Sequence, residues 1–91
     1  MNPITIQQIK ENAAAAYAAV QGGMNYFCMS YANQAAYDRH VADMYRQAFE
    51  SLLNGPVQGS HEEHLKACQE AYKAWQSFEK RYDLALDRLA Y

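Results

Sequence analysis

The stretch from Ser60 to Tyr91 contains neither glycine nor proline, and side chains spaced three or four residues apart in it are apolar except for one charge, Glu79. This spacing places them on one side of an α-helix, and it is the spacing used when helices pack along one another. The side chains that form this seam are Leu65, Cys68, Tyr72, Trp75, Tyr82, Leu86 and Leu89. The sequence therefore predicts one long helix over residues 61–90, which would span about 45 Å at 1.5 Å per residue.

Capping signals mark where two of the helices begin. Ser60 followed by Glu63, and Thr5 followed by Gln8, have the spacing of a capping box, in which the side chains satisfy exposed backbone N–H groups. Ile4 and Ile9 flank the earlier cap with the spacing of a hydrophobic staple. We expect a first helix over residues 6–20, in a segment rich in alanine.

Two turn signals separate the remaining elements. Gly22 and Gly23 end or bend the first helix, and Asn54-Gly55-Pro56 stops the second, with asparagine and glycine suited to a left-handed cap. We place the second helix over residues 24–53, with its start anywhere between Met24 and Ala32. The pattern leaves open whether that stretch is regular helix and whether the first two helices are continuous.

These elements predict an all-α protein in a single domain covering residues 1–91. The short loop after Pro56 makes the second and third helices antiparallel neighbours. The first helix is too short to cover the whole hairpin. We therefore expect a three-helix bundle whose hairpin is partly uncovered, or a homodimer that completes a larger bundle.

The charge balance argues against several classes of protein. Net charge is −2, which does not suit a nucleic-acid binder. Lys66, Lys73 and Lys80 recur every seven residues, but acidic residues surround them and the column is typical of a solvated helix flank. The N-terminal residues do not read as a signal peptide and no apolar run is long enough to cross a membrane, so we expect a cytoplasmic protein without membrane contact.

The aromatic content is the unusual feature of the composition. The chain has 8 tyrosines, 4 methionines and 1 tryptophan among 91 residues, and these residue types are enriched at protein interfaces. Some tyrosines belong to the helix seams, and the others would be hard to bury together in three helices. The candidate interface residues are Tyr26, Tyr31, Met44, Tyr45, Phe49 and Tyr91. Loose core packing is the alternative explanation.

One constellation has the spacing of a metal site. His61, His64 and Cys68 would lie on one side of the last helix, and Cys28 or His40 would have to supply a fourth ligand. Cys68 already belongs to the apolar seam, however, and no paired-ligand motif accompanies it. The same residues could form a Cys–His nucleophile pair, but no oxyanion-hole or glycine-rich motif supports catalysis. We expect no cofactor, no metal and no enzymatic activity.

In size and helical character the chain resembles the accessory regulators and inhibitors encoded by phages and mobile elements, including anti-CRISPR proteins. That resemblance implies binding to a larger host complex. We therefore expect a non-enzymatic protein-interaction module that binds a protein partner, itself or both. A small helical metal-binding protein using His61, His64 and Cys68, or a structural homo-oligomer, are the alternatives.

Overall fold

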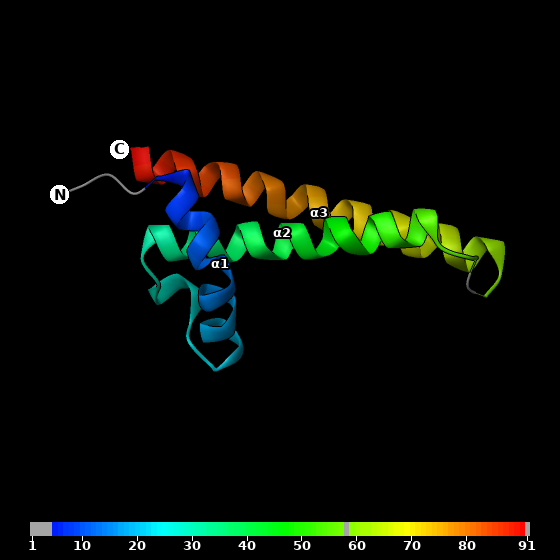
Figure 1. The fold of residues 1–91 in the computed structure, drawn as a ribbon, viewed down its shortest axis with the longest axis horizontal. Helices are drawn as coiled ribbons and strands as arrows, with labels where there is room; N and C mark the ends of the chain where they lie inside the picture. Colours follow the sequence, from blue (N-terminus) through cyan, green and yellow to red (C-terminus); the bar gives the residue numbers. More distant parts are fainter. Residues whose placement is uncertain (1–4, 58, 91) are drawn as a thin grey trace.

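A computed structural model describes residues 5–57 and 59–90 of the chain. It contains three α-helices and a short 3-10 helix: α1 (Ile6–Gln21), η1 (Tyr26–Cys28), α2 (Tyr31–Asn54) and α3 (His61–Ala90). The expected all-α architecture is confirmed. Figure 1 shows α2 and α3 as a long antiparallel hairpin, with α1 crossing it at the end where α3 finishes. The molecule is elongated, measuring 53 × 26 × 19 Å.

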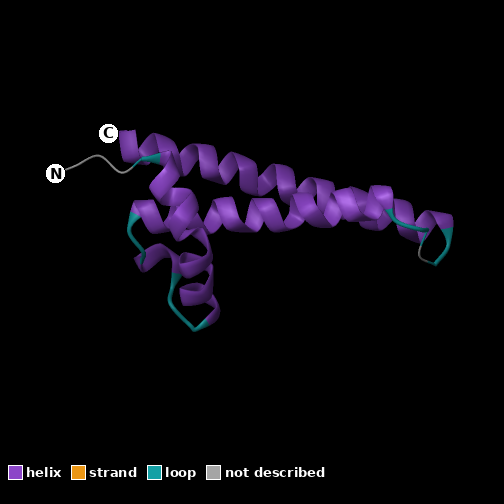
Figure 2. Cartoon of the chain, viewed as in Figure 1, coloured by secondary structure: helices purple, strands orange, loops and turns teal. Residues whose placement is uncertain are grey.

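The central helix is α2, which packs against both α1 and α3, whereas α1 and α3 make few direct contacts. Figure 2 shows the consequence: the end of the hairpin that carries the α2–α3 loop projects away from α1. The first helix thus covers one end of the hairpin, as expected from its length. In the described chain, nothing packs over the other end.

The core lies where α1 crosses the hairpin. Its buried residues are Ile9, Ala13, Ala16, Met29, Ala35, Ala36, Tyr82 and Ala85. Five of these are alanines, so the helices approach closely and bury little side-chain volume. Of the expected α1 face, Ile9, Ala13 and Ala16 are buried but Ile6 is exposed.

The capping prediction holds in full at α1 and for the serine half of the box at α3. Thr5 and Gln8 form the full capping box of α1, and the Ser60 hydroxyl accepts a hydrogen bond from the Glu63 backbone N–H at 3.2 Å. Ile4, the outer residue of the expected staple, lies outside the described residues.

Two expectations about helix ends need correction. The second helix does not extend over residues 24–30: it begins at Tyr31, within the range left open, because Ser30 caps it and accepts from Asn33 N. Gly55 does not adopt a left-handed cap but is extended (φ −96°, ψ 175°), since the proline that follows disfavours helical backbone at the preceding residue. The first two helices are separate, and Gly23 takes the left-handed backbone between them (φ 105°).

Candidate functional site

The segment between α1 and α2 is held in shape by local hydrogen bonds. The Asn25 side chain accepts from Phe27 N at 3.0 Å, which caps η1, and Ser30 caps α2. Gly23 has a positive φ that side chains other than glycine rarely adopt. The chain therefore changes direction twice in the nine residues between α1 and α2. The 3-10 helix η1 lies outside the α2–α3 hairpin and has a defined position.

Buried polar groups tie η1 to α2. The Tyr26 hydroxyl donates to Asp38 Oδ2 at 2.6 Å. The Gln34 amide Nε2 donates to the carbonyl oxygens of Met29, at 3.1 Å, and Tyr26, at 3.3 Å. Asp38 is fully buried and Gln34 nearly so. Since buried polar groups are costly unless they are paired, these bonds hold η1 in one position.

Two arginines of α3 complete this network. Arg81 Nε lies 3.4 Å from Asp38 Oδ1, an ion pair that lacks hydrogen-bond geometry. Arg88 donates to Gln34 Oε1 at 3.3 Å. The same guanidinium groups lie over aromatic rings, with Arg81 at 5.0 Å from the Tyr26 ring and Arg88 at 5.9 Å from the Tyr31 ring. The network thus joins all three of η1, α2 and α3.

Burial shifts the titration of both central groups. Burial raises the pKa of the Asp38 carboxyl above its ordinary value, although the Tyr26 hydrogen bond and the Arg81 charge oppose this shift. Burial and the hydrogen bond to Asp38 both raise the pKa of Tyr26, so its hydroxyl stays protonated and available as a donor. The arrangement is that of a structural clamp, because the Asp38 carboxyl is fully buried and the Tyr26 hydroxyl is bound to it.

The outer side of this clamp is apolar and exposed. Phe27 is 84% exposed, Leu84 58% and Tyr31 55%. Tyr26, Phe27, Leu84 and the two arginines line an open cavity of about 280 Å³ between η1 and α3. We call Phe27, Tyr31, Arg81, Leu84 and Arg88 the η1 surface. It combines exposed aromatic and aliphatic side chains with two guanidinium groups.

A second exposed apolar region lies at the uncovered end of the hairpin. Leu53 is 59% exposed, Leu65 50% and Tyr72 46%. They surround an open groove of about 410 Å³ lined by Phe49, Leu53, Leu65, Cys68, Gln69, Tyr72 and Lys73. We call these residues the free-end groove. Phe49 closes its floor by packing on Tyr72, with ring centroids 5.4 Å apart.

The structure distributes the predicted interface residues over several places. Tyr31 belongs to the η1 surface and Phe49 to the free-end groove. Met44 and Tyr45 are 43% and 39% exposed between these regions, where Tyr45 stacks on Phe78 at 5.9 Å. Tyr26 is half-buried and its hydroxyl is bound to Asp38. Tyr91 lies outside the described residues.

The metal-site residues do not form a cluster in the described structure. Among residues 5–57 and 59–90, no three His, Cys, Asp or Glu side chains are placed to hold a metal ion. His61 is exposed, whereas Cys68 is buried in the free-end groove. The suggested fourth ligands are elsewhere: Cys28 is an exposed free thiol on η1, and the His40 ring packs on Tyr17 at 4.7 Å.

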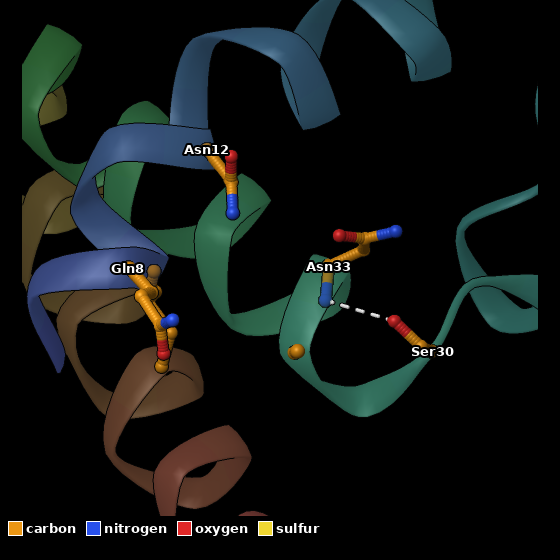
Figure 3. A pocket seen from close by; sticks show the side chains of 6 residues that line it. Gln8, Asn12, Ser30 and Asn33 are labelled. Atoms are coloured by element: carbon orange, nitrogen blue, oxygen red, sulfur yellow. Dashed lines mark hydrogen bonds between the residues drawn. The ribbon is translucent and has the colours of Figure 1, made fainter. Parts of the chain in front are cut away.

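A cavity of about 270 Å³ with a mixed polar and apolar lining lies where α1 and α2 begin. Figure 3 shows Gln8 and Asn12 of α1 facing Ser30 and Asn33 across it. The Ser30 hydroxyl accepts from Asn33 N at 3.2 Å, so it serves as a helix cap. The residues that line this cavity therefore serve as the first turns and the cap of the two helices. None of these lining residues is charged, and none is an activated nucleophile.

Sequence analysis missed Phe27, Leu84, Arg81 and Arg88 as members of one surface. One signal was present: Leu84 is a leucine on the charged face of α3, outside the apolar seam. The seam of the second helix, extended backward, reaches Phe27, but the structure places Phe27 in the separate 3-10 helix η1, so the spacing did not predict its exposure. The Lys66, Lys73 and Lys80 column is exposed along α3, as expected of a helix flank.

Comparison with protein-family models, with curated proteins and with solved structures finds no match for this chain. Within the described residues, no helix combines the length and apolar character needed to cross a bilayer.

Proposed function

We propose that this chain is a non-enzymatic protein-binding module whose partner docks on the η1 surface. The observation that carries the proposal is Phe27, which is 84% exposed on a segment that buried hydrogen bonds hold in place. A partner that covers a phenylalanine side chain gains about 1.5–3 kcal/mol relative to leaving it in water. Exposing such a residue on a fixed element favours a binding role.

Pre-organisation strengthens this argument. A flexible loop would lose conformational entropy on binding, whereas η1 is already ordered by its bonds to Asp38 and Gln34. The composition of the surface also fits, because aromatic residues and arginine are enriched at binding hot spots. The hydrogen bonds beneath η1 thus hold the η1 surface in one conformation before a partner binds.

The surface indicates the chemistry of the partner. An apolar side chain fits the cavity between Phe27 and Leu84. Within the described chain Arg88 donates to the Gln34 amide, lies over the Tyr31 ring and acts on the buried Asp38 carboxyl. It also lines the open cavity, where its other N–H groups can bind a carboxylate. We infer a partner segment that presents an apolar residue beside an acidic one. A regulator or inhibitor of a larger complex is the role that such a module would have.

A pair of truncations tests the proposal. Phe27→Ala removes an exposed side chain and should change the free energy of unfolding by no more than about 0.5 kcal/mol. It should weaken capture of the native partner by about 2 kcal/mol, roughly thirtyfold, as truncation of a hot-spot residue does. Capture by the tagged chain from its own cells is measured by quantitative mass spectrometry.

The matched control is Val57→Ala, which truncates an apolar side chain that is 57% exposed in the α2–α3 loop. Proteins lost with Phe27→Ala and retained with Val57→Ala are partners of the η1 surface. If the two variants capture the same proteins equally well, the proposal is wrong.

A further inference from the structure

The outer side of α3 carries a row of cations that continues the η1 surface along the helix. Residues three, four or seven apart lie on the same side of an α-helix. The row, which we call the basic stripe, consists of Lys73, Lys80, Arg81, Leu84 and Arg88. Arg81 is half-buried and the other four are exposed, whereas the buried residues Ala71, Tyr82 and Ala85 lie on the opposite side of α3.

The two lysines of the basic stripe are not neutralised by the chain itself. In the part of the chain that the structure describes, neither Lys73 nor Lys80 forms an ion pair, and each ion pair there involves an arginine. Asp83 and Asp87 follow one edge of the stripe, on the side of Leu84 away from the two arginines. The stripe therefore presents positive charge, and its acidic edge confines an anionic ligand to the side nearest η1.

The spacing of the stripe indicates the shape of the ligand. Arg81 and Arg88 are seven residues apart, about 10.5 Å along the axis, with Leu84 between them. Two carboxylates that flank an apolar side chain on one side of a helix have the same separation of about 10.5 Å at seven residues. On one face of a strand the available separations are about 7 Å and about 13 Å. The arrangement of charges thus matches a helix.

The same arrangement favours a protein over a nucleic acid. A nucleic acid carries a phosphate at every nucleotide, so a strand along α3 would bring negative charge against Asp83 and Asp87. The net charge of −2 adds to this repulsion. A helix can instead place carboxylates opposite the cations alone, with an apolar side chain opposite Leu84.

We propose that the partner segment on the η1 surface is an acidic amphipathic helix that lies along the basic stripe. Its apolar residue enters the cavity between Phe27 and Leu84, so the proposal rests on the proposed function. It goes beyond that function because it assigns contacts to Lys73 and Lys80, which lie outside the η1 surface. Charge-assisted hydrogen bonds to the arginines fix the register of the helix, and the lysines speed its approach.

Contact between the lysines and the partner's carboxylates is measured by zero-length crosslinking. A carbodiimide joins an amine directly to a carboxylate as an amide, with loss of water, so it links only groups in contact. The tagged chain captures its partner from its own cells, and mass spectrometry identifies the linked peptides. We expect Lys73 and Lys80 to be linked to one helical segment of the protein whose capture Phe27→Ala weakens. Lys10, exposed on α1, should give no link to it.

Charge reversal tests the energetic contribution of the stripe. Lys80→Glu should weaken capture of the same protein by about five- to tenfold, because it replaces an attraction with a repulsion. The matched control is Lys10→Glu, which makes the same change of charge on an exposed residue of α1 and should leave capture unchanged. Circular dichroism checks that both variants keep the helicity of the wild type.

The outcomes separate this inference from the proposed function. A protein whose capture depends on Phe27, but which is insensitive to Lys80→Glu and gives no link to the lysines, would overturn the inference alone. Links scattered over several segments of the partner would also overturn it, as would capture that is lost on nuclease treatment, which would assign the stripe to a nucleic acid. If no captured protein depends on Phe27, both proposals are wrong.

Discussion

At the scale of single residues, the most informative group is Asp38. Its carboxyl is fully buried, accepts from the Tyr26 hydroxyl and faces Arg81. Replacing such an ion pair with uncharged groups is often neutral or stabilising, because removing charge from water is costly. The role of the buried Asp38 carboxyl is thus to fix the position of η1 rather than to add to the stability of the fold.

Because the pKa of Asp38 is raised, the contribution of this carboxyl to the free energy of unfolding depends on pH. An unfolded aspartate titrates near pH 3.9, and the folded protein retains the proton to higher pH. Stability from this group is therefore fully present below about pH 3.9 and is lost as pH rises through the folded pKa.

We expect Asp38→Asn to remove this loss of stability with rising pH. The asparagine side-chain oxygen can still accept a hydrogen bond from the Tyr26 hydroxyl. Urea unfolding of both proteins at about pH 4 and about pH 7 measures the loss. The wild type should lose stability relative to the variant on going to the higher pH. A wild type that instead gains relative stability would show that Arg81 lowers the pKa of Asp38 below its ordinary value.

At the scale of elements, the long helices and their caps could be predicted and the segment between α1 and α2 could not. The apolar spacing in α3 and the caps at Thr5 and Ser60 are local signals, and each is present in the structure. The periodicity of α2 can be extended back through Ser30 and Phe27, but the fold of residues 24–30 depends instead on Gln34, Asp38 and two distant arginines. Contacts between residues that are far apart in sequence leave no local pattern.

The same limit applies to the seam of α3. Leu65 and Tyr72 follow the spacing of buried residues, and yet they are 50% and 46% exposed. Spacing predicts which side of a helix is apolar, but not whether another element covers it. Only the position of α1 across the far end of the hairpin shows that this part of the seam is open.

The start of α2 provides a prediction at this scale. The Ser30 hydroxyl accepts from Asn33 N and ends the η1 segment where the helix begins. Ser30→Ala should lower the free energy of unfolding by about 1 kcal/mol, the usual cost of losing a serine cap. Chemical denaturation measures the change, and Ser51→Ala, on an exposed part of the same helix, is the control. Equal effects of the two substitutions would contradict the capping role.

At the scale of the whole molecule, the two exposed regions lie at opposite ends of an elongated structure. The η1 surface is beside the core, where α1, α2 and α3 meet, and the free-end groove is near the α2–α3 loop.

The central claim is that a partner protein contacts the η1 surface directly, and site-specific photo-crosslinking measures such contact. A photoreactive phenylalanine analogue is placed at position 27 in cells that make the native partner, and at position 57 as the control. The account predicts a discrete adduct with one other protein from position 27, with little or none from position 57. Adducts of equal yield from both positions, or no adduct from position 27, would contradict it.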